Sequence, residues 1–372
     1  MDAQTTPDWT PPFETGDPAP WFDAAAPGSE RYYFSATTGR YILLGFVPGP
    51  GALRNVAFNA FQAHRSLFDD SHLSAFLVLR DAESIEKARN QPPGLRWFLD
   101  PDGRVSRLYG ALDAEGGEHP YWLLLDPSHR TLACVPFGKL AELYARIAAL
   151  PPVDDYAGTE LYAPVLVLPR VLEPDLCRRL IGLYEAEGGT LSGVMRDVDG
   201  RTIGVLDDFK RRRDVMLSDP DIRNELMVRI RSCLAPAIER VFQFKATRVE
   251  RYLVACYDAA DGGYFRPHRD NETLGTAHRR FAVSINLNAE DFEGGDLRFP
   301  EYGSRTYRPP TGGAVVFACG LQHEATPVTR GRRYAFLPFL YDQAGQVIRE
   351  RNMGALKGPS EAADSPDAAP AP

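Results

Sequence analysis

The pattern of apolar and polar positions differs between the two halves of the chain. In the first half, apolar runs such as Tyr41–Phe46 and Ser74–Leu79 alternate with segments of helical periodicity, such as Val56–Phe68 and Ala82–Asn90. Short apolar runs separated by helices are typical of buried strands in an α/β sheet. We therefore predict an α/β domain over residues 16–152.

The break between the halves falls at Pro151–Tyr156, where two prolines end an amphipathic segment and two aspartates favour solvent. The second half opens with a strand at 165–168 and with helices at 173–187 and about 220–242. From Thr247 onward, Gly and Pro turns separate short apolar runs, and strands are expected at 249–256, 281–287, 297–299, 313–319 and 333–341. Helices followed by a run of strands predict a β-sandwich or jelly roll with helical support on one side, which we place at 160–345.

Both ends of the chain are poor in residues that build a core. Residues 1–15 are acidic and Pro-rich, and residues 357–372 are mostly Ala, Pro, Ser and acidic residues. Such compositions predict a disordered lead and a disordered tail. The N-terminus has neither a basic region nor an apolar core, so we expect no signal peptide. No apolar run approaches the ~20 residues of a membrane span.

Charge and cysteine content narrow the expected partners and compartment. The 372-residue chain has a formal net charge of -8 at pH 7, which argues against general nucleic-acid binding by phosphate neutralisation. Its five cysteines are dispersed without CxxC spacing, a set that predicts reduced thiols in a cytoplasmic protein. We expect neither nucleic acid nor a membrane as partner, and the sequence leaves the oligomeric state open.

The chemistry-bearing residues concentrate in the second half. His268 and Asp270 are two positions apart, so on an extended segment their side chains share a face. His323 follows 53 residues later, just past an apolar strand, and Arg333 comes ten residues after it. Two imidazoles and one carboxylate form the facial triad of non-haem Fe(II) oxygenases, and an arginine is a fixed cation for a dicarboxylate cosubstrate. The His268–Asp270 spacing alone is weak evidence, because a surface turn also accounts for it.

Five sequence motifs surround these residues, and they lie at Leu253–Tyr257, Gly263–Asn271, Glu293–Phe299, Pro309–Phe317 and His323–Tyr334. They resemble the double-stranded β-helix core of the 2-oxoglutarate- and Fe(II)-dependent dioxygenases, and most closely the prolyl 4-hydroxylase type. They follow that family's order and spacing over roughly residues 250–342, about a quarter of the chain. The resemblance implies a jelly roll, with the helices from Glu173 onward as its support.

The resemblance implies a role for each residue of the set. His268, Asp270 and His323 would ligate Fe(II), and Arg333 would bind the distal carboxylate of 2-oxoglutarate. Arg332 must point the other way on a strand, so periodicity alone does not choose between the two arginines. O2 is the further cosubstrate, and ascorbate is a candidate reductant. The implied reaction hydroxylates an unactivated C–H bond and releases succinate and CO2.

Four other residues near the set need separate interpretations. Tyr257 is a candidate for a cosubstrate contact that the resemblance implies, and a packed barrel aromatic is the alternative. Tyr264 is a second candidate that faces the pocket, and a position in the barrel wall is its alternative. Asn286 stands where related enzymes can place a second cosubstrate tyrosine, so its contact with the cosubstrate stays open. His278, in a loop rich in arginine, is expected at the surface.

The segment before the core carries a run of cations that suits a substrate lid. Gly193–Val215 contains aspartates, glycines and the basic run Lys210–Arg213. Mobile loops often cover the substrate in the enzymes that the chain resembles, and Arg211, Arg212 and Arg213 would then favour an acidic substrate or acidic peptide. A solvated run of charges is the alternative.

Motifs of the first half lie at Gly16–Phe22, Gly39–Pro48, Phe98–Gly110 and Tyr121–Asp126. They resemble a peroxiredoxin of the thioredoxin fold. That family's peroxidatic cysteine should follow Pro48 at the start of a helix, where a thiol pKa is lowered, but no cysteine occurs there. Cys134, the only cysteine of this half, is expected to be buried packing. We therefore expect no peroxidase activity, and a docking or substrate-recognition role instead.

Three classes of function follow from these residues. The favoured class is a hydroxylase, whose substrate is a prolyl residue of a protein or peptide or a free small molecule. The second is a non-catalytic protein that senses iron, oxygen or 2-oxoglutarate, or that binds partners through its thioredoxin-like fold. The third is a cupin-like jelly roll with a different metal, against which Arg333 and the order of His268 and Asp270 argue.

Overall fold

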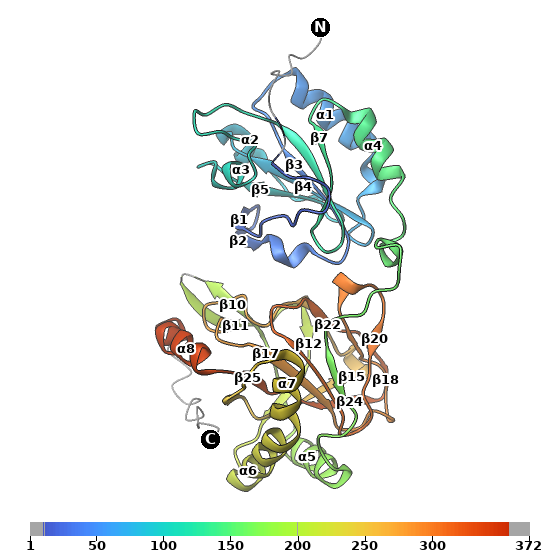
Figure 1. Cartoon of the computed structure of the whole chain (residues 1–372), viewed down its shortest axis with the longest axis vertical. Coiled ribbons are helices and arrows are strands. Elements are labelled where there is room, and N and C mark those ends of the chain that lie inside the picture. Colours follow the sequence, from blue (N-terminus) through green and yellow to red (C-terminus); the bar gives the residue numbers. More distant parts are fainter. Residues whose placement is uncertain (1–9, 11, 199, 357–372) are drawn as a thin grey trace. The chain divides into compact units, whose positions relative to one another are not determined.

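The computed structural model describes residues 10, 12–198 and 200–356 (Figure 1). The predicted tail at 357–372, and residues 1–9 and 11 of the predicted lead, lie outside the described residues. The chain divides into two compact units. Unit 1 contains residues 1–162 and 300–303, and unit 2 contains residues 163–299 and 304–372.

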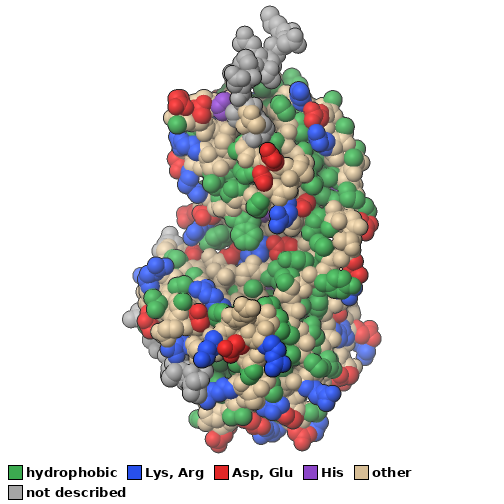
Figure 2. Space-filling view, in the orientation of Figure 1, with side chains coloured by type: hydrophobic (Ala, Val, Ile, Leu, Met, Phe, Trp, Pro, Cys, Tyr) green, Lys and Arg blue, Asp and Glu red, His purple; other side chains and the backbone are tan. Residues whose placement is uncertain are grey.

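Charged side chains of both signs are interspersed on the face of the molecule that Figure 2 shows. Figure 2 shows lysines and arginines next to acidic residues on the visible face of each unit, so neither sign dominates that face. Among the helices that the structure describes, none combines the length and the apolar character that crossing a membrane requires.

Unit 1 is built around a seven-stranded sheet of order β2-β1-β5-β4-β3-β6-β7. β3, β4 and β5 pair in parallel, whereas β6 pairs antiparallel with β3, and β7 antiparallel with β6. The strands are β1 (Asp23–Ala26), β2 (Ser29–Tyr33), β3 (Tyr41–Phe46), β4 (Leu73–Leu79), β5 (Leu95–Leu99), β6 (Tyr121–Leu125) and β7 (Thr131–Pro136). The helices are α1 (Ala52–Ala63), α2 (Ala82–Lys87), α3 (Arg104–Leu108) and α4 (Leu140–Ala148).

Alternate side chains of the central strands pack into two cores, one on each face of the sheet. Leu43 of β3 packs in a cluster with Phe61 of α1 and Leu143 of α4, whereas the adjacent Leu44 lies in a second cluster with Phe98 of β5. Every residue of β3 and β4 is buried, which explains their uninterrupted apolar runs. Phe13, assigned to the lead by the sequence, packs on this unit's Tyr109 with ring centroids 5.4 Å apart.

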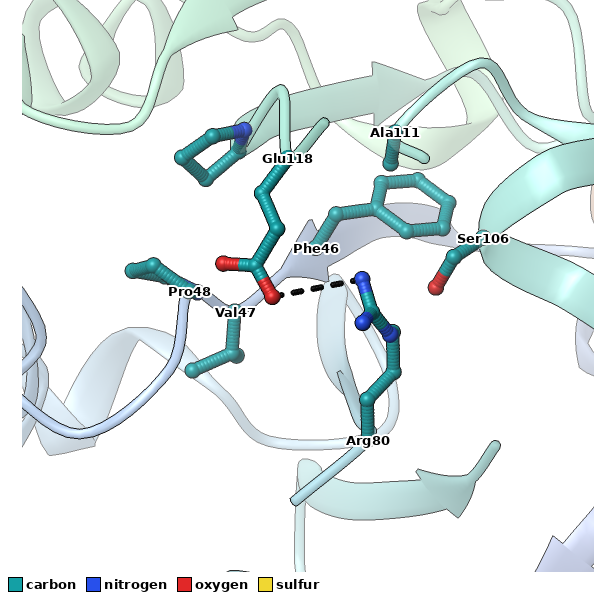
Figure 3. Close-up of a pocket in the computed structure, with 8 residues that line it drawn as sticks. Phe46, Val47, Pro48, Arg80, Ser106, Ala111 and Glu118 are labelled. Carbon is teal, nitrogen blue, oxygen red and sulfur yellow. Dashed lines mark ion pairs between the residues drawn. The ribbon is translucent and has the colours of Figure 1, made fainter. Parts of the chain in front are cut away.

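A small pocket lies where β3 ends (Figure 3). Glu118 and Arg80 form an ion pair there at 3.3 Å, and the Glu118 carboxylate also accepts a hydrogen bond of 3.3 Å from the Gly49 amide. The pocket is lined by Phe46, Val47, Pro48, Arg80, Ser106, Ala111, Glu118 and Pro120.

Unit 2 contains two larger sheets and two separate strand pairs. The nine-stranded sheet has the order β14-β25-β17-β24-β15-β13-β9, and β21 and β8 extend it from β17. It consists of β8 (Leu166–Leu168), β9 (Thr190–Leu191), β13 (Arg213–Met216), β14 (Arg248–Glu250), β15 (Leu253–Asp258), β17 (Phe281–Asn286), β21 (Ala314–Ala318), β24 (Arg332–Phe336) and β25 (Phe339–Tyr341). The five-stranded sheet, of order β12-β16-β22-β19-β20, consists of β12 (Lys210–Arg211), β16 (Tyr264–His268), β19 (Leu297–Arg298), β20 (Thr306–Tyr307) and β22 (His323–Ala325). The separate pairs are β10 (Val194–Val198) with β11 (Arg201–Val205) and β18 (Glu293–Gly294) with β23 (Val328–Arg330).

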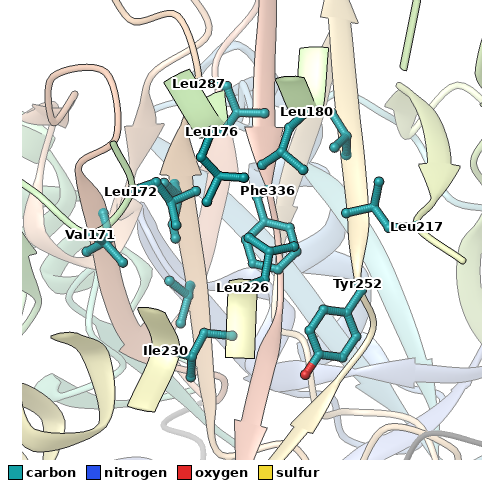
Figure 4. Close-up of a cluster of buried hydrophobic side chains, with 14 of the residues drawn as sticks. Val171, Leu172, Leu176, Leu180, Leu217, Leu226, Ile230, Tyr252, Leu287 and Phe336 are labelled. Atoms are coloured by element: carbon teal, nitrogen blue, oxygen red, sulfur yellow. The ribbon is translucent and has the colours of Figure 1, made fainter. Parts of the chain in front are cut away.

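The larger sheet has helices on one face and the smaller sheet on the other. On β15, Val254 packs in the cluster that holds Leu180 and Leu226, which project from two helices towards the strands (Figure 4). The adjacent Ala255 packs instead with Ala325 of the smaller sheet. The covering helices are α5 (Pro174–Glu187), α6 (Pro220–Arg229) and α7 (Ala235–Phe242). The space between the two sheets is therefore an interior layer.

One predicted helix is divided in the structure, and one helix was not indicated by the sequence pattern. The helix expected at about 220–242 is α6 and α7 joined by a π turn at Ile230–Leu234. Pro236 has no N–H to donate to the preceding turn, so regular α-helix is interrupted before it. The additional helix is α8 (Gln343–Leu356), near the end of the described chain.

Two predicted strands are also divided. The strand expected at 249–256 breaks into β14 and β15 at Arg251, whose φ of 66° does not continue an extended segment. The strand expected at 333–341 breaks into β24 and β25 around Pro338, which cannot donate a ladder hydrogen bond. Each break lets the chain change partners within the same sheet.

Candidate metal and cosubstrate site

Two antiparallel strands bring three metal-binding side chains together. His268 ends β16 and pairs directly with His323, which opens β22. Asp270 lies two residues beyond the end of β16, with its carboxylate 3.6 Å from His268 Nε2 and 3.3 Å from His323 Nε2. One ligand atom from each residue lies within 4.8 Å of the others. Among the described residues, this is the one group of three or more His, Cys, Asp or Glu side chains placed closely enough to hold a metal ion.

The imidazole hydrogen bonds orient both histidines towards a common point. His268 Nδ1 lies 2.7 Å from the Arg266 carbonyl, and His323 Nδ1 lies 3.0 Å from the Leu321 carbonyl. A carbonyl oxygen only accepts, so each Nδ1 carries the proton and each Nε2 presents its lone pair on the side of Asp270. This tautomer is the one that Nε2 ligation of a metal requires.

Burial and neighbouring charges keep the pKa values of His268 and Asp270 low. Burial, and then the charge of His323, lower the pKa of His268 to about 4, so its imidazole is neutral near pH 7. Burial opposes ionisation of Asp270, but His323 and His268 hold the pKa of its carboxyl well below the usual range. Two neutral imidazoles and one carboxylate form a donor set that fits Fe(II).

Arg333 of β24 lies in the interior layer against Tyr257, in whose apolar cluster Phe265 stacks on the ring of His268. It is 3% exposed, and its guanidinium donates to Ser284 Oγ at 2.7 Å and to Asn286 Oδ1 at 3.2 Å. Burial lowers the pKa of Arg333, and its hydrogen-bond acceptors are neutral, so the group suits a carboxylate ligand. Arg332 points the other way and pairs with Asp258 at 2.7 Å on the surface.

Ser284 is a contact of Arg333 that the sequence reasoning missed. It lies two positions before Asn286 on β17, so both side chains point to the same face. Asn286 also donates to the Pro309 carbonyl at 2.9 Å, which fixes its amide so that its oxygen faces Arg333. The period-two pattern of β17 was the available signal for Ser284.

The structure places the two candidate tyrosines differently. Tyr257 is 3% exposed and is paired with Arg333 across the β15–β24 ladder, with the guanidinium 5.3 Å from its ring centroid. Tyr264 is partly exposed, and its hydroxyl donates to the Asp208 carbonyl at 2.7 Å. The structure therefore brings Tyr257, but not Tyr264, to the arginine.

The basic run before the core alternates between interior and surface. Lys210 and Arg212 are 7% and 5% exposed, and Arg212 pairs with Asp214 at 2.6 Å. Arg211 is only partly buried, and Arg213 is exposed. Alternation along extended chain explains the division, so two of the three predicted lid arginines point away from the interior.

The expectation that His278 lies at the surface is wrong. The residue is 2% exposed, and its Nε2 lies 2.7 Å from the Glu250 carboxylate, which Arg279 also binds at 2.6 Å. Burial alone would raise the pKa of Glu250, but Arg279 and His278 hold it well below the usual range. A buried carboxylate needs such donors, which explains the burial of His278. Arg279 also contacts the backbone carbonyl of Asp270 at 3.4 Å, so the cluster supports the metal-binding set.

No thiol takes the place of the missing cysteine in unit 1. Just past the end of β3, the Gly49 amide donates a hydrogen bond to the Glu118 carboxylate. Cys134 lies on β7, half-buried, and its thiol contacts the Phe13 carbonyl at 3.4 Å. Burial raises the pKa of Cys134 to about 11, so the thiol stays protonated near pH 7.

Residues 252–341 match the family described as the 2OG-Fe(II) oxygenase superfamily. A PKHD-type hydroxylase of Synechococcus sp. (strain JA-2-3B'a(2-13)) is 29% identical over 117 residues, which are 29% of this chain and 51% of that protein. A PKHD-type hydroxylase of Pseudomonas fluorescens is 36% identical over 112 residues, 28% of this chain and 47% of that protein. Human procollagen-lysine,2-oxoglutarate 5-dioxygenase 2 is 30% identical over 133 residues, 34% of this chain and 17% of that protein. The chain spans about half the length of the PKHD-type relatives that it matches.

Solved structures also align with the chain. A prolyl-4-hydroxylase of Pseudomonas putida aligns with a TM-score of 0.37 and 22% identity, over 53% of this chain and 98% of that one. A prolyl hydroxylase of Trichoplax adhaerens, in complex with a hypoxia inducible factor peptide fragment, aligns with a TM-score of 0.40 and 17% identity, over 56% and 95% of the two chains. The family match over residues 252–341 and the hydroxylase relatives make this segment similar to 2-oxoglutarate-dependent dioxygenases, an enzyme class that uses Fe(II), 2-oxoglutarate and O2.

Proposed function

We propose that the protein hydroxylates an unactivated C–H bond and couples this reaction to the decarboxylation of 2-oxoglutarate. The observation that carries the proposal is the buried donor set of His268, Asp270 and His323 beside Arg333, a buried cation whose hydrogen-bond acceptors are neutral. Bound Fe(II) would supply the activation of O2, one atom of which enters succinate while the other enters the substrate as a hydroxyl group.

The chain's own residues hold and orient the reactants. Arg333 binds the distal carboxylate of 2-oxoglutarate, and Ser284 and Asn286 keep its guanidinium in place before the cosubstrate arrives. Tyr257 forms a wall beside the guanidinium. The apolar residues between the two sheets, such as Ala255, exclude water from the reacting centre.

For the primary substrate we propose a protein or peptide, with a prolyl residue as the first candidate. The support for a protein or peptide is the likeness to hydroxylases, one of which is named for procollagen lysine. The prolyl candidate rests on the resemblance of the sequence motifs to the prolyl 4-hydroxylase type. A free small molecule is the alternative that the same chemistry serves. Succinate release in the presence of prolyl peptides and of free amino acids distinguishes the two.

An anaerobic titration tests the reaction class. Fe(II) and 2-oxoglutarate are added to the protein, and the weak visible charge-transfer band of their chelate is recorded. We expect a band in the wild type and none in His268→Ala, which removes a metal donor. His64→Ala, at an exposed position of unit 1, is the matched control and should keep the band. A wild type that binds Fe(II) without giving the band would contradict the proposed function.

For unit 1 we propose a thioredoxin-like module without thiol chemistry, which serves docking or substrate recognition. Its parallel β3-α1-β4 segment followed by the antiparallel β6-β7 pair and α4 supports this interpretation. The protonated thiol of Cys134 supports the absence of peroxidase activity. Consumption of hydrogen peroxide with dithiothreitol as reductant is the test, and a turnover that disappears in Cys134→Ser would contradict the proposal.

A further inference from the structure

Lys210 is a buried cation one aromatic ring away from the metal-binding set. It pairs with Phe265 across the β12–β16 ladder, and its ammonium lies 4.9 Å from the Phe265 ring centroid. The same ring stacks on the imidazole of His268, with centroids 3.5 Å apart. Phe265 also packs with the apolar residues between the two sheets. The ammonium therefore faces the interior in which the reaction is proposed to occur.

The ammonium of Lys210 has hydrogen-bond partners but no ion-pair partner. It donates to Ser192 Oγ at 2.6 Å and to the Gly193 carbonyl at 3.0 Å, and both acceptors are neutral. Among the residues that the structure describes, no carboxylate lies within ion-pair distance of it. An ammonium has three N–H donors, so one of them is left for a ligand. A buried cation without an anion is unstable, and burial lowers the pKa of Lys210 well below the usual range.

The neighbouring charges do not compensate Lys210. Asp214 and Asp270 are the anions whose fields reach it, but Asp214 is paired with Arg212 at 2.6 Å and Asp270 belongs to the metal-binding set. Arg212 and Arg251 are cations whose fields also reach it and oppose its charge. These two anions and two cations offset one another, so they leave the charge of Lys210 itself uncompensated.

The proposed reactants leave this positive charge unmatched. Fe(II) carries two positive charges against one negative charge on Asp270, and Arg333 adds one more. The two carboxylates of 2-oxoglutarate balance this sum of two. Lys210 then still lacks an anion, and the primary substrate is the reactant that remains to provide it.

We propose that Lys210 binds a carboxylate of the primary substrate, close to the carbon that is hydroxylated. The substrate class is then a carboxylate, which comes either from an acidic residue of a peptide or from a free organic acid. This inference rests on the proposed function and makes it more specific. It also assigns the recognition to the inward-facing Lys210 and not to Arg211 or Arg213.

The test compares probes that differ only in the carboxylate. In the peptide arm, acetylated and amidated tripeptides contain proline next to either glutamate or glutamine. In the free-acid arm, N-acetylproline is compared with N-acetylprolinamide. Dissociation constants are measured anaerobically on the Fe(II)- and 2-oxoglutarate-loaded protein from the change in the visible band. Succinate release is then measured in air, and the responding arm identifies the source of the carboxylate.

The variants separate the role of Lys210 from general electrostatics. In one arm, the wild type should bind the carboxylate probe about ten-fold or more tightly than its amide partner, as expected for a charge-assisted hydrogen bond. Lys210→Met should reduce this ratio to within about two-fold, and Lys210→Arg should restore part of it. Arg211→Met removes a charge from the neighbouring surface position and should retain the full ratio.

The outcomes distinguish this inference from the proposed function. Equal behaviour of the carboxylate and amide probes in the wild type, including no binding by either, would overturn the inference while the chelate band stands. The inference would also be overturned if Lys210→Met kept the ratio of carboxylate to amide binding but bound 2-oxoglutarate about ten-fold more weakly. Lys210 would then bind the cosubstrate and not the primary substrate. Absence of the band in the wild type would overturn the proposed function and this inference with it.

Discussion

Replacement of Glu250 by glutamine tests whether the buried cluster behind the metal-binding set stabilises unit 2. The Glu250 carboxylate accepts hydrogen bonds from His278 Nε2 at 2.7 Å and from Arg279 at 2.6 and 2.9 Å. Glutamine keeps the size of the side chain but removes the negative charge, so the guanidinium of Arg279 stays buried without an anion. The side chains of Arg279 and Glu250 are 9% and 13% exposed, so water and salt screen that loss only weakly.

The expected cost follows from the burial of both partners. Removal of one member of a buried, hydrogen-bonded ion pair typically costs about 3–5 kcal/mol, and the amide oxygen of glutamine retains part of the hydrogen bonding. We therefore expect Glu250→Gln to lower the free energy of unfolding by about 3 kcal/mol at pH 7. Because Arg279 also contacts the Asp270 carbonyl, Fe(II) affinity should fall by roughly ten-fold.

Urea unfolding monitored by circular dichroism measures the first effect, and anaerobic Fe(II) titration measures the second. Glu293→Gln is the matched control, since that carboxylate pairs with Arg330 at 2.8 Å but its side chain is 61% exposed. The control should change the free energy of unfolding by less than about 1 kcal/mol, as for other exposed ion pairs. Equal effects of the two substitutions would refute the argument from burial.

The pH dependence provides an independent check with a defined sign. The pKa of Glu250 is lowered in the folded state, so its stabilisation is fully present above the unfolded-state pKa of about 4.3. It is lost as the pH falls through the lower pKa of the folded state. The difference in stability between the wild type and Glu250→Gln should therefore be constant near neutral pH and shrink in acid. A difference that grows below pH ~4 would contradict the assignment of the charge.

Three further substitutions or reagents test other parts of the structure. Arg333→Met should weaken 2-oxoglutarate binding about 100-fold, because two charge-assisted hydrogen bonds are lost. Arg332→Met, at the surface, should change this binding less than about two-fold, and the chelate band measures both affinities. Alkylation of Cys134 by iodoacetamide at pH 8 should be slower than that of a free thiol, because burial raises the pKa of Cys134 to about 11, and mass spectrometry of the peptide follows it. Leu180→Ala, at a fully buried position of α5, should cost about 2–5 kcal/mol in urea unfolding.

The sequence pattern located most elements but not their interruptions. Continuous apolar runs mark β3 and β4 because every residue of these strands is buried. The break at Arg251 depends on how the chain meets its neighbours in the folded unit, whereas the π turn before α7 follows from Pro236. Apolar periodicity carries no signal for either. The burial of His278 was likewise invisible, because its partner Glu250 is 28 residues away in the sequence.

The candidate site was predicted more completely than the fold. The spacing of His268 and Asp270, and the position of His323 after an apolar strand, follow from the chemistry of a facial triad, and the structure brings the three residues together. Ser284 was missed because a serine in a strand has many ordinary roles. Tyr264 had the right residue type, but its hydroxyl binds the Asp208 carbonyl, a contact that no local pattern indicates.

The basic segments show that the face of a strand to which each cation points decides the electrostatics of the interior. At Arg332 and Arg333, and again at Lys210 and Arg211, adjacent cations carry the same charge, but their side chains point to opposite faces. The outward members Arg332 and Arg211 find carboxylates at the surface. The inward members Arg333 and Lys210 have neutral acceptors and no ion pair among the described residues. An interior that keeps two such cations near a metal-binding set is suited to anions from outside the chain, and our proposals assign these anions as a dicarboxylate cosubstrate for Arg333 and an acidic substrate for Lys210.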